Sequence, residues 1–284
     1  MTATEPQAGV AAPRRRWSPF TWLGVVLLAT AVILGFLGAF LTTMRVRSYD
    51  PVSVAADGMT NLDVDVDSGD LAVACGPSES FVLTQKNVTD RWYMNAEGGT
   101  VHVWQESDNN WLPQIWFFGK PAEKAALEIP QSLCEQSLTA DLSVDAGSLD
   151  VKADVDGATV DVRAGSLSLA GAANAVTANV AAGSADLNID DAEQVAVEVR
   201  SGSVEGAFTQ VPEQLTADVG AGSASLALPA GNYTVNSNAE AGSVSNNLTI
   251  DSSAPAGAID VSVDAGSVSL EDKKKGERRA ATIQ

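Results

Sequence analysis

The chain contains 284 residues, 45% of them hydrophobic, with 36 acidic and 17 basic side chains that give a formal net charge of −19. A surface this acidic repels phosphate, so the composition argues against a nucleic-acid partner. His102 is the single histidine, which removes most histidine-dependent catalysis and most zinc or haem sites. The sequence also lacks the G-x-S-x-G, H-E-x-x-H and paired C-x-x-C motifs. We therefore expect no cofactor, no metal and no catalytic residue, in a protein that is not an enzyme.

The N-terminal part of the chain has the pattern of a membrane span. Residues 20–41 form a run of 22 residues without a charge, and at about 1.5 Å per residue this run spans about 33 Å, enough for the core of a bilayer. The sequence predicts one transmembrane helix at residues 20–44 that acts as a signal anchor in the cell membrane. The stub at residues 1–19 would be cytoplasmic and disordered, and the C-terminal domain would be extracytoplasmic. A cleaved signal peptide is the alternative, although the run exceeds the usual apolar region of about 7–15 residues.

The rest of the chain is divided by its charge. Residues 48–270 hold 32 acidic and 7 basic side chains, whereas both ends of the chain are basic. We expect a linker at residues 45–60, an N-terminal β region with an aromatic insertion at residues 61–135, and a disordered basic tail at residues 271–284.

The two cysteines, Cys75 and Cys134, both lie in the acidic part. Outside the cytoplasm, a lone pair of cysteines is usually a disulfide, which makes these two residues candidates for one. Two separate buried thiols are the alternative.

Residues 136–270 contain a short motif that recurs at nearly constant spacing, as in VDVRAGSLSL. Apolar and polar residues alternate on both sides of a Gly-Ser pair, which indicates two strands with one buried face each. Successive pairs lie 18 to 24 residues apart, a period typical of solenoids. Glycine adopts backbone angles closed to other residues, so each is expected to form a corner between two strands. The predicted corner glycines are Gly69, Gly147, Gly165, Gly183, Gly202, Gly222, Gly242 and Gly266.

This repeat predicts an all-β fold. We expect a β-solenoid, or parallel β-helix-like stack, with turns of about 18–20 residues and each strand paired with its equivalent one turn away. Stacking would align the serines that follow the glycines, including Ser148, Ser166 and Ser184, in one column.

The D-x-x-x-G-S/D units, together with apolar segments that end in proline at residues 127–130 and 226–229, resemble a bacterial domain family of unknown function labelled putative adhesin. The resemblance covers about residues 60–270. It implies an extracytoplasmic β-solenoid of the cell envelope, often behind a single membrane anchor, and it supplies no catalytic residues.

Residues 91–120 interrupt the repeat and are rich in aromatic side chains. One interpretation is a hydrophobic cap over the open end of the solenoid, since an uncapped stack exposes its core and its strand edges. The other is an exposed patch that stacks on sugar rings, docks on a partner or enters the membrane surface. The candidate residues are Trp92, Trp104, Trp111, Trp116, Phe117 and Phe118.

Two functions remain open at this point. The first is a non-enzymatic, membrane-anchored, adhesin-like protein that presents a solenoid surface to an envelope polymer or to a membrane protein. The second is a protein that binds or cleaves envelope polysaccharide with the aromatic segment at residues 92–118. Four aspartates between residues 63 and 70 loosely resemble a calcium loop, but Ser68 and Ala74 stand where an EF-hand has Gly and Glu.

Overall fold

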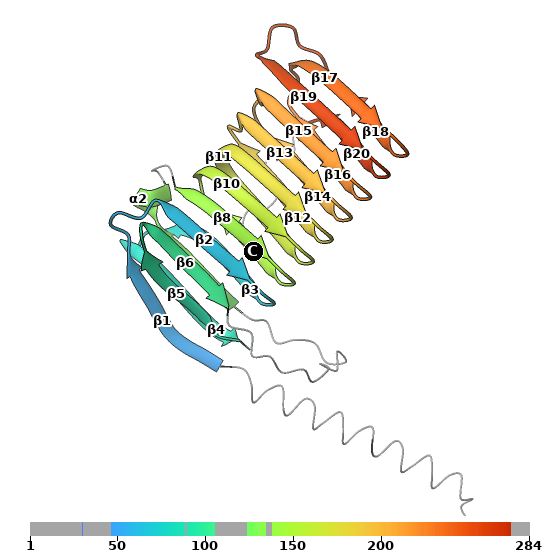
Figure 1. Ribbon diagram of the computed structural model, residues 1–284. Helices are drawn as coiled ribbons and strands as arrows, with labels where there is room; N and C mark the ends of the chain where they lie inside the picture. Colours follow the sequence, from blue (N-terminus) through green and yellow to red (C-terminus); the bar gives the residue numbers. More distant parts are fainter. Residues whose placement is uncertain (1–29, 31–46, 89, 106–123, 135–137, 274–284) are drawn as a thin grey trace, which may run out of the picture. The chain divides into compact units, whose positions relative to one another are not determined.

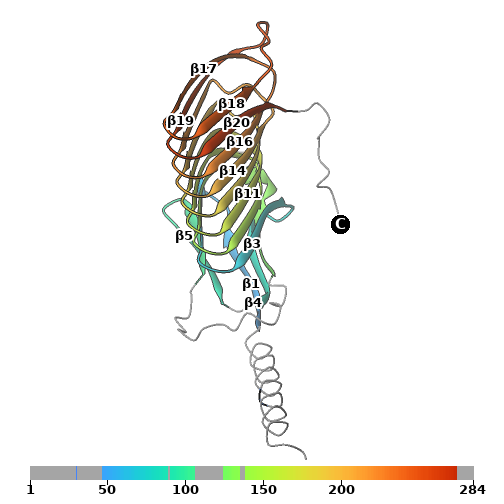
Figure 2. The ribbon, with the colours of Figure 1, turned by 90° about the vertical axis from the view of Figure 1, so that its right-hand side faces the viewer.

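The computed structural model of the protein describes residue 30 and residues 47–88, 90–105, 124–134 and 138–273. The described residues from 47 onward belong to one compact unit. This unit is built almost entirely of strands, and its described part has one short helix, α2 (Gln131–Cys134). The strands lie in two sheets that are stacked rung upon rung (Figures 1 and 2). The all-β prediction is therefore confirmed.

We name the two sheets A and B. Sheet A contains, in spatial order, β1 (Arg47–Ala55), β4 (Ser80–Val88), β7 (Lys124–Pro130), β3 (Asp70–Gly76), β9 (Ser148–Lys152), the first half of β11 (Ser166–Val180), β12 (Ser184–Asp190), β14 (Ser203–Phe208), β16 (Ser223–Leu228), β20 (Ser267–Asp272) and β18 (Ser243–Asn247). Sheet B contains β5 (Trp92–Glu97), β6 (Thr100–Gln105), β2 (Asn61–Val66), β8 (Thr139–Val144), β10 (Val155–Val162), the second half of β11, β13 (Gln194–Val199), β15 (Gln214–Val219), β19 (Ala256–Val263) and β17 (Asn232–Ala239).

Each rung consists of a strand of sheet B, a corner and a strand of sheet A. Neighbouring rungs pair in parallel and in register, so that Ser166 lies opposite Ser148 on one side and opposite Ser184 on the other. The same register continues through Ser203 and Ser223. The predicted serine column is thus confirmed, and the stack is solenoid-like.

The corner glycines lie where predicted, but the physical reason differs from the one expected. None of them has a positive φ, and the glycines that do are Gly58, Gly98, Gly99 and Gly171. A Cβ atom built on Gly165 would lie 2.4 Å from the carbonyl oxygen of Gly147 and 2.5 Å from Cγ1 of Val144. Real side chains do not approach so closely. Glycine is therefore required because successive corners touch, not because the backbone turns through the left-handed region.

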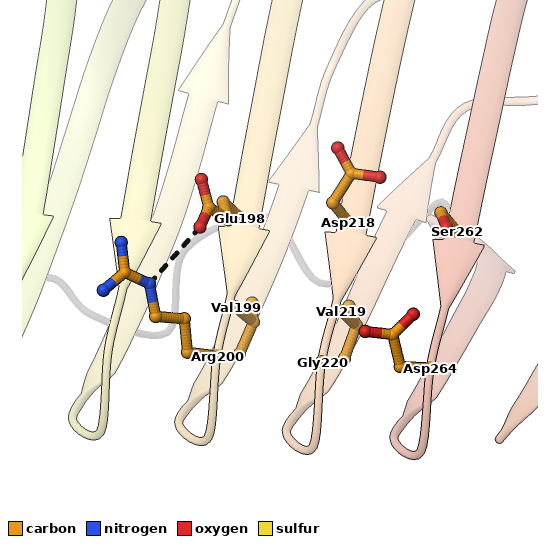
Figure 3. A pocket seen from close by; sticks show the side chains of 8 residues that line it. All are labelled: Glu198, Val199, Arg200, Asp218, Val219, Gly220, Ser262 and Asp264. Atoms are coloured by element: carbon orange, nitrogen blue, oxygen red, sulfur yellow. Dashed lines mark hydrogen bonds and ion pairs between the residues drawn. The ribbon is translucent and has the colours of Figure 1, made fainter. Parts of the chain in front are cut away.

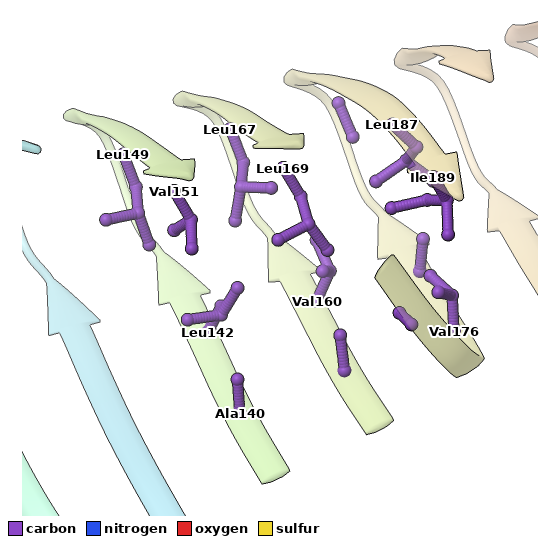
Figure 4. Close-up of a cluster of buried hydrophobic side chains, with 14 of the residues drawn as sticks. Ala140, Leu142, Leu149, Val151, Val160, Leu167, Leu169, Val176, Leu187 and Ile189 are labelled. Atoms are coloured by element: carbon purple, nitrogen blue, oxygen red, sulfur yellow. The ribbon is translucent and has the colours of Figure 1, made fainter. Parts of the chain in front are cut away.

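The core lies between the two sheets and continues from rung to rung. Alternate residues of each strand point inward, and they form columns of Leu, Val, Ile and Ala (Figure 4). Leu149, Leu167 and Leu187, for example, are each at most 2% exposed. The alternation of apolar and polar residues in the repeat is sufficient to place these side chains, since strand side chains alternate between faces.

The order of rungs at the C-terminal end differs from the prediction. The rung built from β19 and β20 lies between the rung of β15 and β16 and the rung of β17 and β18. The chain therefore places residues 232–247 last in space, although residues 256–272 are last in sequence. The expectation that each strand pairs with the next repeat along the chain is wrong at this end. The inserted rung has the more apolar inward residues, which explains its interior position.

The N-terminal end has a similar rearrangement. The rung of β2 and β3 pairs with β8 and β9 on one side and with β6 and β7 on the other. Beyond β6 and β7, the strands β5, β4 and β1 add in antiparallel orientation. Residues 47–55 were expected in a linker at residues 45–60, but they form the edge strand β1 and complete this end of sheet A.

The two cysteines form a disulfide that joins the end of β3 to α2. Their Cα atoms lie 6.3 Å apart and 59 positions separate them in sequence. The bond fixes the N-terminal β region to the segment that leads into the repeats.

The predicted transmembrane helix at residues 20–44, apart from Thr30, and the stub at residues 1–19 lie outside the described residues. So does the basic tail from residue 274 onward. In the part of the chain that the structure describes, no helix is both long enough and apolar enough to cross a bilayer.

Candidate functional site

The outer face of sheet B carries an aromatic pair at its N-terminal end. Strand alternation turns Trp92 and Met94 of β5 into the core, so Tyr93 between them faces outward. Trp104 of β6 lies directly opposite Tyr93, and the two rings stack with centroids 5.7 Å apart at an interplanar angle of 17°. Offset stacking of this kind is a favourable arrangement for aromatic rings.

The aromatic pair borders an open groove of about 460 Å³. Its lining comes from four neighbouring strands of sheet B and combines aromatic, acidic, amide and hydroxyl side chains. The residues that line it are Asp63, Asp65, Asn95, Glu97, His102, Val103, Trp104 and Ser143. Parallel register explains the grouping, because Trp104 lies opposite Asp65, and Asp65 lies opposite Ser143.

One polar contact joins two of the side chains that line this groove, His102 and Asp63. Nδ1 of His102 lies 2.8 Å from Oδ2 of Asp63, and the two side chains are 38% and 45% exposed. The pair lies opposite in register on β6 and β2. The contact ties the imidazole to β2, and both side chains remain partly exposed.

The electrostatics of the groove are acidic. The pKa of the Asp65 carboxyl lies above its usual range, mainly because the surrounding side chains remove water, and repulsion from Asp67 and Asp145 adds to this. Arg163 acts in the opposite direction, and its guanidinium also lies 2.6 Å from a carboxylate oxygen of Asp145. Loss of water and the like charges therefore make ionisation of Asp65 less favourable than that of a fully solvated aspartate.

A cation borders the outer side of the aromatic pair. The guanidinium of Arg91 lies 5.1 Å from the ring centroid of Tyr93 and 5.1 Å from that of Tyr49. Cation–π contacts of this kind contribute about 0.5–1 kcal/mol at exposed sites. They hold Tyr93 in place and extend the aromatic platform onto β1.

A second groove, of about 350 Å³, lies further along the same face (Figure 3). Glu198 and Arg200 form an ion pair of 3.4 Å there, beside Asp218 and Asp264. This groove has no aromatic lining, and its charged side chains are well exposed. Exposed ion pairs of this type contribute little, so we regard it as a solvated surface.

The aromatic segment had two predicted roles, a cap over the core and an exposed patch. Two of its tryptophans lie in different environments. Trp92 is 1% exposed and packs into the core at the end of the stack, as a cap residue would. Trp104 is half-buried on the outer face, where it lines the groove. The other candidates, Trp111, Trp116, Phe117 and Phe118, lie outside the described residues.

Sequence reasoning missed the partners of Trp104. Tyr93, Asn95, Glu97 and Ser143 were not singled out, and Asp63 and Asp65 were considered only as part of a calcium loop. The alternation around Trp92 could have placed Tyr93 outward, but the pairing of β6 with β2 could not be read from the chain. Within the described residues, no group of three or more His, Cys, Asp or Glu side chains is arranged to hold a metal ion.

The fold is similar to that of several solved structures of low sequence identity. A cell adhesion protein from Clostridium sporogenes, described as putative, has 11% identity and a TM-score of 0.38, with 80% of this chain and 100% of that chain covered. An adhesin from Bacteroides fragilis with the same qualifier has 10% identity and a TM-score of 0.42, with 78% and 96% covered. A lipid-binding protein from Parabacteroides distasonis, also described as putative, has 13% identity and a TM-score of 0.40, with 78% and 96% covered.

The sequence matches no curated protein. The family model of the toastrack domain, DUF4097, matches residues 59–283, which include every strand of the stack except β1. This match extends over most of the chain and agrees with the repeat that the glycine corners define. The chain belongs to the toastrack DUF4097 family.

Proposed function

We propose that this chain is a non-enzymatic, adhesin-like protein of the cell envelope. In this proposal residues 20–44 anchor it in the membrane as a single span with the N-terminus in the cytoplasm, and the β-solenoid lies outside. The groove beside Trp104 binds a polysaccharide that is neutral or carries amino groups.

The observation that supports this function best is the composition of the groove. A half-buried indole on the outer face, stacked on Tyr93, lies beside carboxylate, amide and imidazole groups that can form hydrogen bonds. Sugars present apolar ring faces and hydroxyl edges, so aromatic platforms flanked by polar groups are suited to them. Tyr93 and Trp104 also stabilise the β5–β6 hairpin, but hairpin stability alone does not require acids and an amide around the indole.

The charge of the protein narrows the class of ligand. The groove contains Asp63, Asp65 and Glu97, within a region of 32 acidic and 7 basic side chains. An anionic polymer would be repelled by this field, whereas a neutral or amino-bearing polymer would not. Binding, not cleavage, is proposed, because the groove is open and none of its carboxylates is buried.

Two observations support a location outside the cytoplasm. The uncharged run at residues 20–41 is long enough to span a bilayer, and the Cys75–Cys134 disulfide is of a kind that persists in oxidising compartments.

The test is co-sedimentation of the full-length protein, in detergent micelles, with insoluble purified cell-wall polysaccharide. We expect wild type to bind, Trp104→Ala to bind at least tenfold more weakly, and Trp104→Phe to retain part of the affinity. Glu198→Gln, in the second groove, is the matched control and should bind as wild type does. The proposal fails if wild type does not bind, or if Trp104→Ala binds equally well. Release of reducing ends from the polymer would show that the protein is an enzyme instead.

A further inference from the structure

The C-terminal end of the stack exposes two strand edges side by side. Within the described residues, β17 pairs only with β19 and β18 only with β20, apart from an isolated bridge between Gly231 and Ile250. Both sheets therefore end at the same rung, with one side of each terminal strand left without a neighbouring strand (Figures 1 and 2).

The inward positions of this last rung are unlike those of the rung beneath it. Ser237 and Asn246 lie opposite Val261 and Leu270 in register, and Ala239 lies opposite Val263. The apolar residues of the inner rung are buried, whereas the three residues of the last rung are exposed. The side chain of Ile250, at the end of the rung, is 60% exposed.

Natural sheets usually protect such edges with charge, proline or a bulge. The N-terminal edge has all three, since β1 contains Arg47, Asp50 and Pro51 and its pairing with β4 is interrupted by register shifts. In contrast, β17 and β18 contain neither a charged residue nor a proline, and their register is unbroken. Glu240, in the corner between them, is the single charged residue of residues 231–250.

From this contrast we propose that the C-terminal end is a self-association surface, on which a second copy of this chain docks. In a two-fold arrangement, the eight residues of β17 and the five of β18 would each pair antiparallel with a strand of the partner. Each sheet would then continue across the interface, and the open end of the core would be covered on both copies.

Two arguments favour a second copy over another occupant. The two edges end at one rung with the spacing of a two-sheet stack, so a single extended peptide would pair with only one of them. The edge strands also favour the approach of two copies of a strongly acidic protein, because β17 and β18 contain no carboxylate that would repel its equivalent. The Asn, Ser and Thr side chains of the rung can form hydrogen bonds across the interface.

The experiment measures the mass of the full-length protein in detergent micelles, by sedimentation over a range of concentrations. We expect a dimer for wild type. The double variant with Ser237→Lys and Asn246→Lys places one inward charge on each edge strand, and its dissociation constant should rise at least tenfold. The control with Thr216→Lys and Ser225→Lys adds the same charge to the outer face of an inner rung and should remain dimeric. Circular dichroism checks that all variants keep their strands.

Three results would overturn the proposal. The first is a monomeric wild type over the whole range. The second is a dimer that the edge lysines do not weaken, which would place the interface elsewhere. The third is a protein that becomes dimeric only after deletion of residues 274–284. This result would mean that the C-terminal tail of the same chain, and not a second copy, covers the end of the stack. If the double variant loses strands, amide hydrogen exchange of residues 232–239 in wild type tests the proposal instead. Docking of a second copy predicts that this exchange slows as the protein concentration rises.

Discussion

The two ends of the stack differ in how they cover the core and the strand edges of the last rung. At the N-terminal end, antiparallel strands, a disulfide and buried Trp92 cover the last parallel rung. At the C-terminal end, the last rung is only more polar, and among the described residues no further strand pairs with its edges. A solenoid has to end somewhere, and both the core and the backbone must be accommodated there. The comparison teaches that one end is built as a closed cap and the other as a surface that can accept more sheet.

The largest expected effect of a point substitution concerns the closed end. Trp92→Ala removes a side chain that is 1% exposed from the core of the cap, and such truncations cost about 3–5 kcal/mol. Trp104→Ala, on the outer face of the same hairpin, should cost only about 0.5–1.5 kcal/mol through the lost stacking with Tyr93. Urea unfolding followed by circular dichroism measures both. Equal losses for the two variants would contradict the assignment of Trp92 to the cap and Trp104 to the surface.

A smaller loss of stability is expected when Gln105 is substituted, because its side chain accepts hydrogen bonds from the first corner. Elsewhere in the stack, corner amides donate to the rung before, as Ser148 does to the carbonyl of Gly69 at 2.9 Å. At the first corner, the amides of Ser68 and Gly69 donate instead to Oε1 of Gln105, at 3.1 and 3.0 Å. Because Gln105 is 5% exposed, Gln105→Ala should leave buried donors unpaired and cost about 1–3 kcal/mol.

Exposed Gln194 on β13 provides the control for this substitution. Gln194→Ala should change the free energy of unfolding by less than about 0.5 kcal/mol. Amide exchange locates the effect, since residues 61–76 should lose protection in Gln105→Ala before residues 232–247 do. A uniform loss along the stack would mean that the first corner does not depend on this side chain.

The sequence was sufficient for the features that repeat locally. Corner glycines, the serine column and the inward apolar columns all follow from a period and an alternation that each unit carries within itself. The order of the rungs was not predicted, because it depends on which unit can tolerate solvent. The signal was nevertheless present, since Ser237, Ala239 and Asn246 stand at the positions where the neighbouring unit has Val261, Val263 and Leu270.

The site was less predictable than the fold. Trp104 was a candidate, but its neighbours come from strands that are distant in sequence, with Asp65 on β2 and Ser143 on β8. Gln105 accepts hydrogen bonds from Ser68 and Gly69, which are distant in sequence, and no local pattern indicates such a contact. Side chains that act at the ends of a repeat are specified by the termination of the stack, so the repeat itself cannot reveal them.

The smallest effect concerns the open end, where Tyr233 makes a polar contact. Its hydroxyl donates to the carbonyl oxygen of Pro229 at 2.8 Å, and burial, with a contribution from Asp272, raises the pKa of Tyr233 to about 12. The folded state therefore retains a proton that the unfolded state releases near pH 10, so stability falls as the pH rises from about 10 toward 12. Tyr233→Phe should cost about 0.5–1.5 kcal/mol at pH 7, and this deficit should shrink above pH 10 because the variant has no proton to lose. Urea unfolding of both proteins between pH 7 and 11 measures the difference, and two curves that stay parallel throughout would show that the last rung does not shield Tyr233 from water.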